Sequence, residues 1–399
     1  MIRAIWFQER LDFFSRGPTL VALVIVLIAT VYAGWSGDRW RDGLTQSLTE
    51  FETEKLESLA SFKASLEKIE RGEAAPTLYD ANPMSITIPA ILPPAPLSDF
   101  AVGHADLHPT SAEISPWRNL WSVFGRYQFD NPTTLSAGAF DLALVVIMLM
   151  PIMMIALSFD VLARDRSRRL LPLIIASPFS LPRLVWSRLL LRNGALWIVA
   201  ISAMVLLALI NSHGSGGERT ARFLLWLGAC SLYAAFWLAV IAYCVARFRS
   251  ATATAGAMVG VWLLLTLALP GVLASIGEAL YPTPSRLAFL SEIRQAQGDT
   301  NSNLTDLTSG YLMDHPELSV SQDEIPAYYR AAFLSNEAAR ESTREIVEAY
   351  GSAREGRERT FSWAQYLAPT VLIQRLLTQF AGADLARQHQ FQTLSLIHI

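Results

Sequence analysis

The basic segment 160–192 holds the residues of this sequence whose types and spacing most clearly suit a binding role. It carries seven arginines, four of them in the run 164–169, and only two acidic residues. The apolar segments on either side contain no lysine or arginine. A short basic loop held against a membrane is the part that a cytosolic partner would touch. Nucleic-acid binding is the alternative, but membrane topology already explains the arginines, so we expect no nucleic-acid partner.

A second candidate for chemistry is the stretch His104-Ala105-Asp106-Leu107-His108. On a strand these three polar side chains would share one face and could offer two imidazoles and a carboxylate to a metal ion. No cysteine or third histidine is near in the sequence, and histidine-rich surface turns are common. The sequence therefore predicts no metal site, with His104, Asp106 and His108 as weak candidates only.

No constellation of catalytic residues is present in the apolar segments. They lack paired acids, a Ser/His pair and an HExxH motif, and the whole chain lacks the GxxxxGK[ST] phosphate loop. The glycine cluster at 211–217 has no lysine and is typical of a turn. We therefore expect no enzymatic activity and no directly bound cofactor, so that any ATP must be used by another chain.

Five apolar blocks must position these residues. The chain has 399 residues, 52% hydrophobic and 17% charged, which is too apolar for an ordinary soluble protein of this size. Each block is near the roughly 20 residues that cross a bilayer. We read the first as a retained anchor because its flanks make a poor signal-peptide cleavage site. The sequence predicts an all-α polytopic membrane protein in a lipid bilayer, with spans at 18–34, 138–159, 193–210, 223–246 and 255–277.

Charge asymmetry predicts the orientation. With a cytoplasmic N-terminus, the inside segments 1–17, 160–192 and 247–254 hold twelve arginines and four acids. The outside segments then hold twenty basic and thirty acidic residues. Because short cytoplasmic loops are enriched in lysine and arginine, this distribution favours the N-terminus inside. Residues 1–17 suit either an amphipathic helix in the interface or a simple topogenic leader.

Two largely helical extracytoplasmic regions follow from this topology, at 35–137 and 278–393. In the first, a near-heptad stripe over 38–70 predicts a long helix that packs on another helix of the same domain, or alternatively in an intermolecular coiled coil. Eight prolines in 76–116 predict an ordered, extended strap. In the second, 324–350 reads as a long helix, and the polar residues of 363–380 indicate a surface-packed or interfacial helix rather than a sixth span.

Two positions within the spans are candidates for hinges, Pro151 and the pair Pro270-Gly271, because proline breaks the helical hydrogen-bond ladder. Asp141 opens the second span and could bind an ion, but a helix-starting carboxylate at the interface is favoured. Cys230 and Cys244 lie too far apart along one helix to pair, and we interpret them as packing residues.

Several short motifs of this sequence together resemble those of the ABC-2 type transporter permeases, in the subgroup with a large extracytoplasmic insert between the first two spans. The resemblance covers nearly the whole chain, although each motif is short. Its motifs are Asn131-Pro132, Gly138 to Ala143, Met150-Pro151, Ala156 to Asp160, Ser177-Pro178, Arg183-Leu184, Leu92 to Leu97, Ala101 to Gly103 with Asp106, Tyr281 to Arg286, Asp314 to Leu318, and Leu367 to Pro369.

The resemblance implies six spans, a bacterial cytoplasmic membrane, pairing with a second permease copy or paralogue, and a cytosolic ABC ATPase subunit as partner. The ATPase would bind the loop between the second and third spans and drive export or periplasmic work. One departure concerns charge, because 164–169 is arginine-rich where the subgroup has a Glu-Arg-Glu-like run followed by glycine. The implied coupling residues are Arg164, Asp165, Arg166, Arg168, Arg169, Ser177, Pro178 and Arg183.

The last six residues, 394–399, are what a transposon-end sequencing adapter encodes. We therefore expect the natural chain to continue past about Thr393, with the sixth span lost by truncation. A rival interpretation from another class is a membrane-anchored sensor or scaffold, whose exterior regions bind a ligand while the arginine loop only fixes topology.

Overall fold

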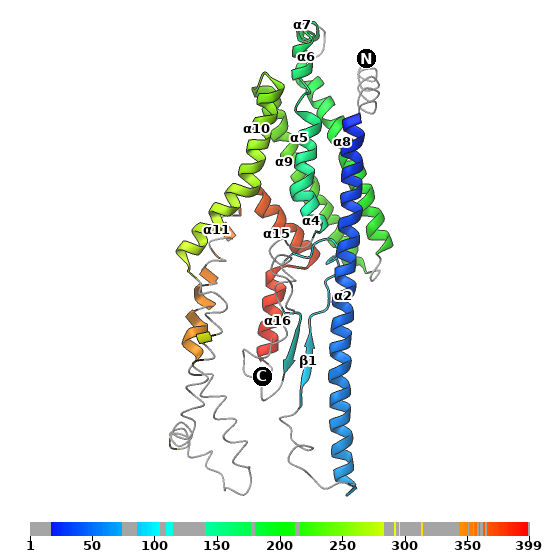
Figure 1. Ribbon diagram of the computed structural model, residues 1–399, viewed down its shortest axis with the longest axis vertical. Helices are drawn as coiled ribbons and strands as arrows, with labels where there is room; N and C mark the ends of the chain where they lie inside the picture. The colour runs from blue at the N-terminus through cyan, green and yellow to red at the C-terminus, as the bar shows by residue number, and fades with distance from the viewer. Residues whose placement is uncertain are drawn as a thin grey trace.

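The protein is an all-α polytopic membrane protein whose described residues include a small β-hairpin (Figure 1). The computed structural model describes residues 17–73, 86–103, 109–114, 140–176, 180–211, 216–282 and 365–397, with short helical stretches between 291 and 363. Within these residues, five helices are long and apolar enough to cross a membrane, which confirms the predicted number of spans. They are Gly17–Glu70, Leu142–Ser167, Leu181–Ile210, Gly217–Arg247 and Ala251–Leu280.

Two of the spans are built from several pieces. The first, third and fourth are the single helices α2 (Gly17–Glu70), α8 (Leu181–Ile210) and α9 (Gly217–Arg247). The second joins α4 (Leu142–Leu144), the π-helical turn η3 (Val145–Leu149), α5 (Met150–Ser158) and α6 (Ala163–Ser167). The fifth joins α10 (Ala251–Leu263), the π-helical turn η4 (Leu264–Ala268) and α11 (Leu269–Leu280).

The bundle has two different ends (Figure 1). One carries α6 and the short helix α7 (Leu171–Ile175), and we call it the loop end. The opposite end carries the strands β1 (Ile88–Ile91) and β2 (Ser111–Ile114), and we call it the hairpin end. The helices α15 (Pro369–Ala381) and α16 (Leu385–Ile397) also lie toward the hairpin end. The large described regions outside the spans thus gather on one side of the bundle.

The core of the bundle lies where α5, α8, α9 and α10 meet. Trp226 and Trp237 of α9, Met150 at the start of α5 and Leu196 of α8 are fully buried there. Many apolar side chains on the outer faces remain exposed, among them Ile28, Ile198, Leu209, Leu232 and Leu264. Helices that are apolar all round bury both faces, one in protein and one in lipid, so this pattern fits a bilayer rather than water.

The helix predicted over 38–70 is the outer part of α2, which runs unbroken for 54 residues. At the standard rise it is about 80 Å long, far more than one bilayer thickness. In the described part of the chain its outer half packs on β1 instead of another helix, with Leu48 and Phe51 buried. Lys55 adds an ion pair of 3.3 Å to Glu113 of β2.

Part of the proline-rich strap pairs into the antiparallel hairpin, with Ile88 opposite Ile114. The extended backbone agrees with the prediction for this stretch, but strand pairing was not foreseen. Pro89 has no N–H for a ladder, which is tolerated in a sheet of only two strands. Phe391, in the middle of α16, packs on Ala112 and so connects α16 to the hairpin.

Helix α15 covers most of the segment 363–380, which was predicted to be a surface-packed or interfacial helix. With 13 residues it is about 20 Å long, too short to span a bilayer. It begins with Pro369 in the first turn, where the missing N–H is harmless, and ends at Gly382 in the left-handed region with φ 77°. A Cβ on Gly382 would lie 2.7 Å from Cβ of Ala95, so both backbone shape and close packing require glycine. One side of α15 lies along α9.

Candidate functional site

The loop end is a short helical projection built on the second and third spans. Helix α6 ends in a Schellman motif, with hydrogen bonds from Leu170 N to Asp165 O at 2.9 Å and from Arg169 N to Arg166 O at 3.1 Å. This pattern places Arg169 at the position where glycine is usual, and its φ is 58°. An arginine therefore occupies a left-handed conformation at the turn into α7, which stores strain.

Buried arginines fix this projection to the spans beneath it. Arg192, 5% exposed, donates from Nη1 to the carbonyl of Leu157 and to Oδ1 of Asp160, both at 2.9 Å. Arg164 pairs with the other oxygen of Asp160, which is thereby shared between two guanidinium groups. Since charged hydrogen bonds are stronger than neutral ones, they make the junction of α5, α6 and α8 stiff.

Two further arginines extend these contacts. Arg188 donates to the carbonyl of Val161 at 3.2 Å and pairs with Asp165. Arg166 donates to the carbonyl of Phe248 at 2.7 Å, in the turn between the fourth and fifth spans. The projection is therefore connected to the third span and to the turn between the fourth and fifth spans.

Three other arginines of the loop take no part in these contacts. Arg168, Arg169 and Arg183 are exposed, as is Leu170 at 39%. Because both aspartates of the loop are already engaged by arginines, the outward surface is cationic. The predicted coupling residues thus divide into Arg164, Asp165 and Arg166, which hold the base, and Arg168, Arg169 and Arg183, which face outward. Ser177 and Pro178 lie outside the described residues.

Sequence reasoning missed the residues of the third span that complete this base. Arg188 and Arg192 are one helical turn apart on α8, a spacing that places both on one face and could have suggested a joint role. Asn193 donates to Ser158 Oγ and to Leu189 O, both at 2.9 Å, which adds a buried polar contact between α8 and α5. Nothing in the sequence indicated that partner.

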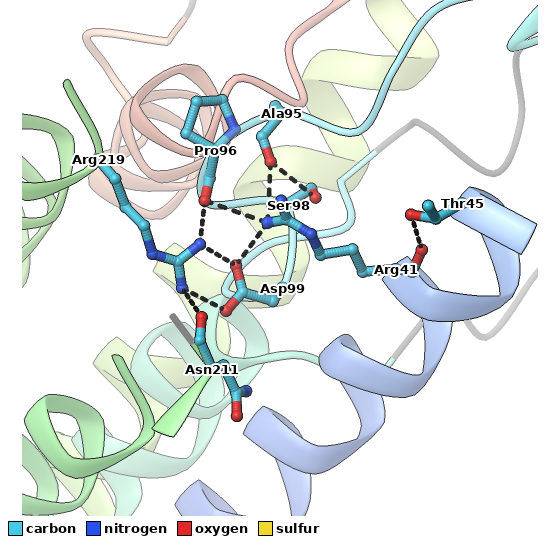
Figure 2. A network of polar contacts seen from close by, with 8 residues as sticks. All are labelled: Arg41, Thr45, Ala95, Pro96, Ser98, Asp99, Asn211 and Arg219. Atoms are coloured by element: carbon cyan, nitrogen blue, oxygen red, sulfur yellow. Dashed lines mark hydrogen bonds and ion pairs between the residues drawn. The ribbon is translucent and has the colours of Figure 1, made fainter. Parts of the chain in front are cut away.

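The hairpin end has its own polar cluster, the Asp99 clasp, formed by Arg41, Asp99 and Arg219 (Figure 2). Arg219 at the start of α9 pairs with Asp99 at 3.0 Å, and Arg41 of α2 reaches the same carboxylate at 3.5 Å. Asp99 is 1% exposed. Both arginines also donate to the carbonyl of Pro96, and Arg219 donates to the carbonyl of Asn211 at the end of α8. The clasp joins the strap to the first, third and fourth spans.

The fit of the strap against α2 is unusually close beside this clasp. A Cβ on Gly37 would lie 1.9 Å from the carbonyl oxygen of Asp99, so no larger residue can stand there without moving the strap. Asp141 caps α4 as expected for a helix-starting carboxylate: it accepts from Leu144 N at 2.8 Å and from Val102 N at 3.0 Å.

Two arginines hold the C-terminal end of α15. Arg222 donates to the carbonyls of Gln379 and Phe380, and Arg387 donates to those of Gly382 and Pro93. Guanidinium groups are favoured there because the last carbonyls of a helix lack internal donors and carry its negative dipole end. Burial lowers the pKa of Arg387, and the nearby charge of Arg222 lowers it further.

Each predicted hinge lies two residues after a π-helical turn. Pro151 follows η3, and Tyr233 of α9 donates its hydroxyl to the carbonyl of Ile147 at 3.2 Å, the carbonyl that Pro151 cannot serve. Pro270 follows η4 with the same spacing. Both prolines thus lie beside an irregular turn of the helix, and at the first of them a neighbouring helix serves the freed carbonyl.

The other candidates add no site. His104, Asp106 and His108 lie outside the described residues, and the residues that are described contain no group of three potential metal ligands. Cys230 and Cys244 are free and buried, in agreement with a packing role.

Comparison with known proteins gives one partial match. Residues 286–394 match a family described as Domain of unknown function (DUF3526). This segment includes α15 and most of α16, and leaves the five spans unmatched. No curated protein and no solved structure gives a significant match.

Proposed function

We propose that this chain is the membrane permease subunit of an ABC-2 type transporter. In this proposal the loop end faces the cytoplasm of a bacterium and receives motion from a separate cytosolic ATPase. A second copy or a paralogue completes the pore, and the hairpin end performs export or conformational work outside the membrane.

The observation that carries the proposal is the division of the arginines at the loop end. Arg166, Arg188 and Arg192 bind backbone carbonyls of the bundle, whereas Arg168, Arg169 and Arg183 offer positive charge outward. A loop that only fixed topology would need the charges but not the buried bonds. A rigid base under a charged tip is what force transfer from a partner requires.

The connections also give the force a route. A push on α6 and α7 reaches α8 through Arg192 and the turn before α10 through Arg166, because neither bond lets the projection move alone. The second span continues from α6 to η3 and Pro151, where a helix bends most easily. Movement would therefore reach the hairpin end through the second and fifth spans.

The test is co-purification from the cells that encode the chain, in mild detergent, with measurement of bound ATPase activity. The double variant Arg168→Glu/Arg169→Glu reverses two charges of the exposed surface. It should reduce the bound ATPase activity roughly tenfold or more, since repulsion between like charges across an interface costs at least about 1.4 kcal/mol of binding free energy. The matched control is Arg71→Glu, an exposed arginine at the hairpin end of α2, which should leave it unchanged.

An ATPase that remains bound to the charge-reversed variant would contradict the role of the tip. Wild-type preparations without any ATP hydrolysis would favour the rival, a membrane-anchored sensor or scaffold.

A further inference from the structure

The two proline joints differ in who supplies the missing hydrogen bond. At the first joint the donor is Tyr233, which belongs to α9 within the bundle. At the second joint the donor is Thr370, whose hydroxyl lies 2.6 Å from the carbonyl of Leu265. Thr370 sits in the first turn of α15, which is not a span. An element outside the set of spans thus reaches the bend of the fifth span.

The backbone of η4 shows what this hydroxyl replaces. The N–H of Leu269 donates to the carbonyl of Leu264, five residues back, instead of to Leu265, four residues back. Leu265 therefore loses its α-helical donor, and the Thr370 hydroxyl occupies its carbonyl. Pro270 cannot serve Thr266, and in the described part of the chain the Thr266 hydroxyl has no hydrogen-bond partner. The turn is held open at one carbonyl by a side chain from another element.

The segment beyond this joint is free to respond. In Figure 1, α11 leans away from the bundle below η4, while α15 runs from the joint toward α4. Val272, Ile276 and Leu280 of α11 are 55%, 46% and 61% exposed. Among the described residues α11 buries only Gly277, and a helix with little packing changes direction at low cost.

We propose that α15 is a wedge that sets the bend of the fifth span, with Thr370 as the residue that holds η4 in its π-helical form. When α15 withdraws, the Leu269 N–H moves from Leu264 to Leu265 and the extra residue of the π turn is removed. Because one residue is about 100° of helix, α11 then rotates by that amount about its axis. The proposal concerns the fifth span alone and holds whatever partner binds the loop end.

This assigns a task to the C-terminal region that matches DUF3526. Its helix α15 is held at the far end by Arg222 and Arg387, so any rearrangement of this region that shifts those contacts would move Thr370 relative to Leu265. A conformational change in this region would therefore alter the bend of the fifth span through the hydroxyl of Thr370.

The experiment measures a distance in the full-length protein. Spin labels are placed at Ile276→Cys on α11 and Leu224→Cys on α9, both exposed, in a background with Cys230→Ala and Cys244→Ala. Thr370→Val removes the hydroxyl at nearly constant volume, and pulsed electron paramagnetic resonance should show a shift of roughly 5 Å or a new population. Thr370→Ser should restore the parent distribution.

Thr378→Val is the matched control. Thr378 lies on the same helix and is similarly buried, but its hydroxyl bonds only to carbonyls of α15 itself, at 3.0 Å. It should not move the labels. A Thr370→Val distribution identical to the parent, or an equal shift in Thr378→Val, would overturn the proposal.

Two further variants keep the test decisive if Thr370→Val folds poorly. Pro270→Ala restores an N–H at the joint, so the Thr370 hydroxyl should lose its influence there, and additive shifts in the double variant would refute the donor exchange. Gly382→Ala forces the end of α15 away from Ala95 and should shift the labels in the same direction as Thr370→Val. An unchanged distribution in this variant would also count against the wedge.

Discussion

The two ends of the bundle use the same chemistry for different purposes. At both, arginines donate to backbone carbonyls and to an aspartate shared by two guanidinium groups. At the hairpin end the shared residue is Asp99, with a side chain 1% exposed, while at the loop end it is Asp160, 19% exposed. The hairpin end is a closed fastening of strap and spans. The loop end has internal ion pairs next to the spans and an exposed, positively charged surface beyond them.

This difference teaches that arginine content alone does not locate a partner surface. What separates the two clusters is whether arginines beside the shared aspartate remain outside the internal contacts. Arg168, Arg169 and Arg183 do so at the loop end. At the hairpin end Arg41 and Arg219 donate to the Asp99 carboxylate, and Arg387 donates to a backbone carbonyl.

The largest effect is expected from breaking the Asp99 clasp. Asp99→Ala leaves the side chains of Arg41 and Arg219 charged at a site where they are 12% and 10% exposed. Loss of one member of a buried ion pair costs about 3–5 kcal/mol, so we expect a large fall in the midpoint of thermal unfolding in detergent. Arg71→Ala breaks an exposed ion pair with Glu67 and should change the free energy of unfolding by less than about 0.5 kcal/mol. Equal midpoints for the two variants would show that the clasp is not structural.

A smaller effect is expected from the corresponding change at the loop end. Asp160→Ala removes the carboxylate between Arg164 and Arg192, but Arg192 keeps the carbonyl of Leu157. The expected loss is about 1–3 kcal/mol, and it should appear mainly as faster amide exchange over 160–192. Asp160→Asn retains an acceptor and should lose less. If Asp160→Ala lowered stability as much as Asp99→Ala, the two ends would be equally closed and the comparison would fail.

The spans could be predicted from sequence because the bilayer imposes length and apolarity on each of them separately. Irregular backbone at Pro151 and Pro270 could be anticipated for the same local reason, since proline disrupts the ladder wherever it stands in a helix, while their action as hinges stays a prediction. The helix-starting role of Asp141 was also a local property, visible in its place at the edge of an apolar block.

The partners that complete each site could not be predicted. Arg192 meets Asp160 across 32 residues, Thr370 meets Leu265 across 105, and Arg219 meets Asp99 across 120. Such contacts depend on how the spans cross and on where the strap settles, and neither leaves a periodic signal in one sequence. The strand pairing of Ile88 with Ile114 was hidden for the same reason, in strands of only four residues each.

The smallest effect is expected from the backbone conformation of Arg169, which tests how rigid the loop end is. Arg169 has φ 58°, a conformation that costs a non-glycine residue about 1 kcal/mol relative to glycine. Arg169→Gly and Arg169→Ala remove the same charge, but only glycine relieves the strain. The glycine variant should therefore exceed the alanine variant by about 1 kcal/mol in local stability, measured by hydrogen exchange over 163–176. If charge is what the partner reads, both variants should lose ATPase binding to a similar degree despite this difference. Equal protection of the two variants would mean that the turn between α6 and α7 relaxes without glycine, and the loop end would then be less rigid than its buried arginines imply.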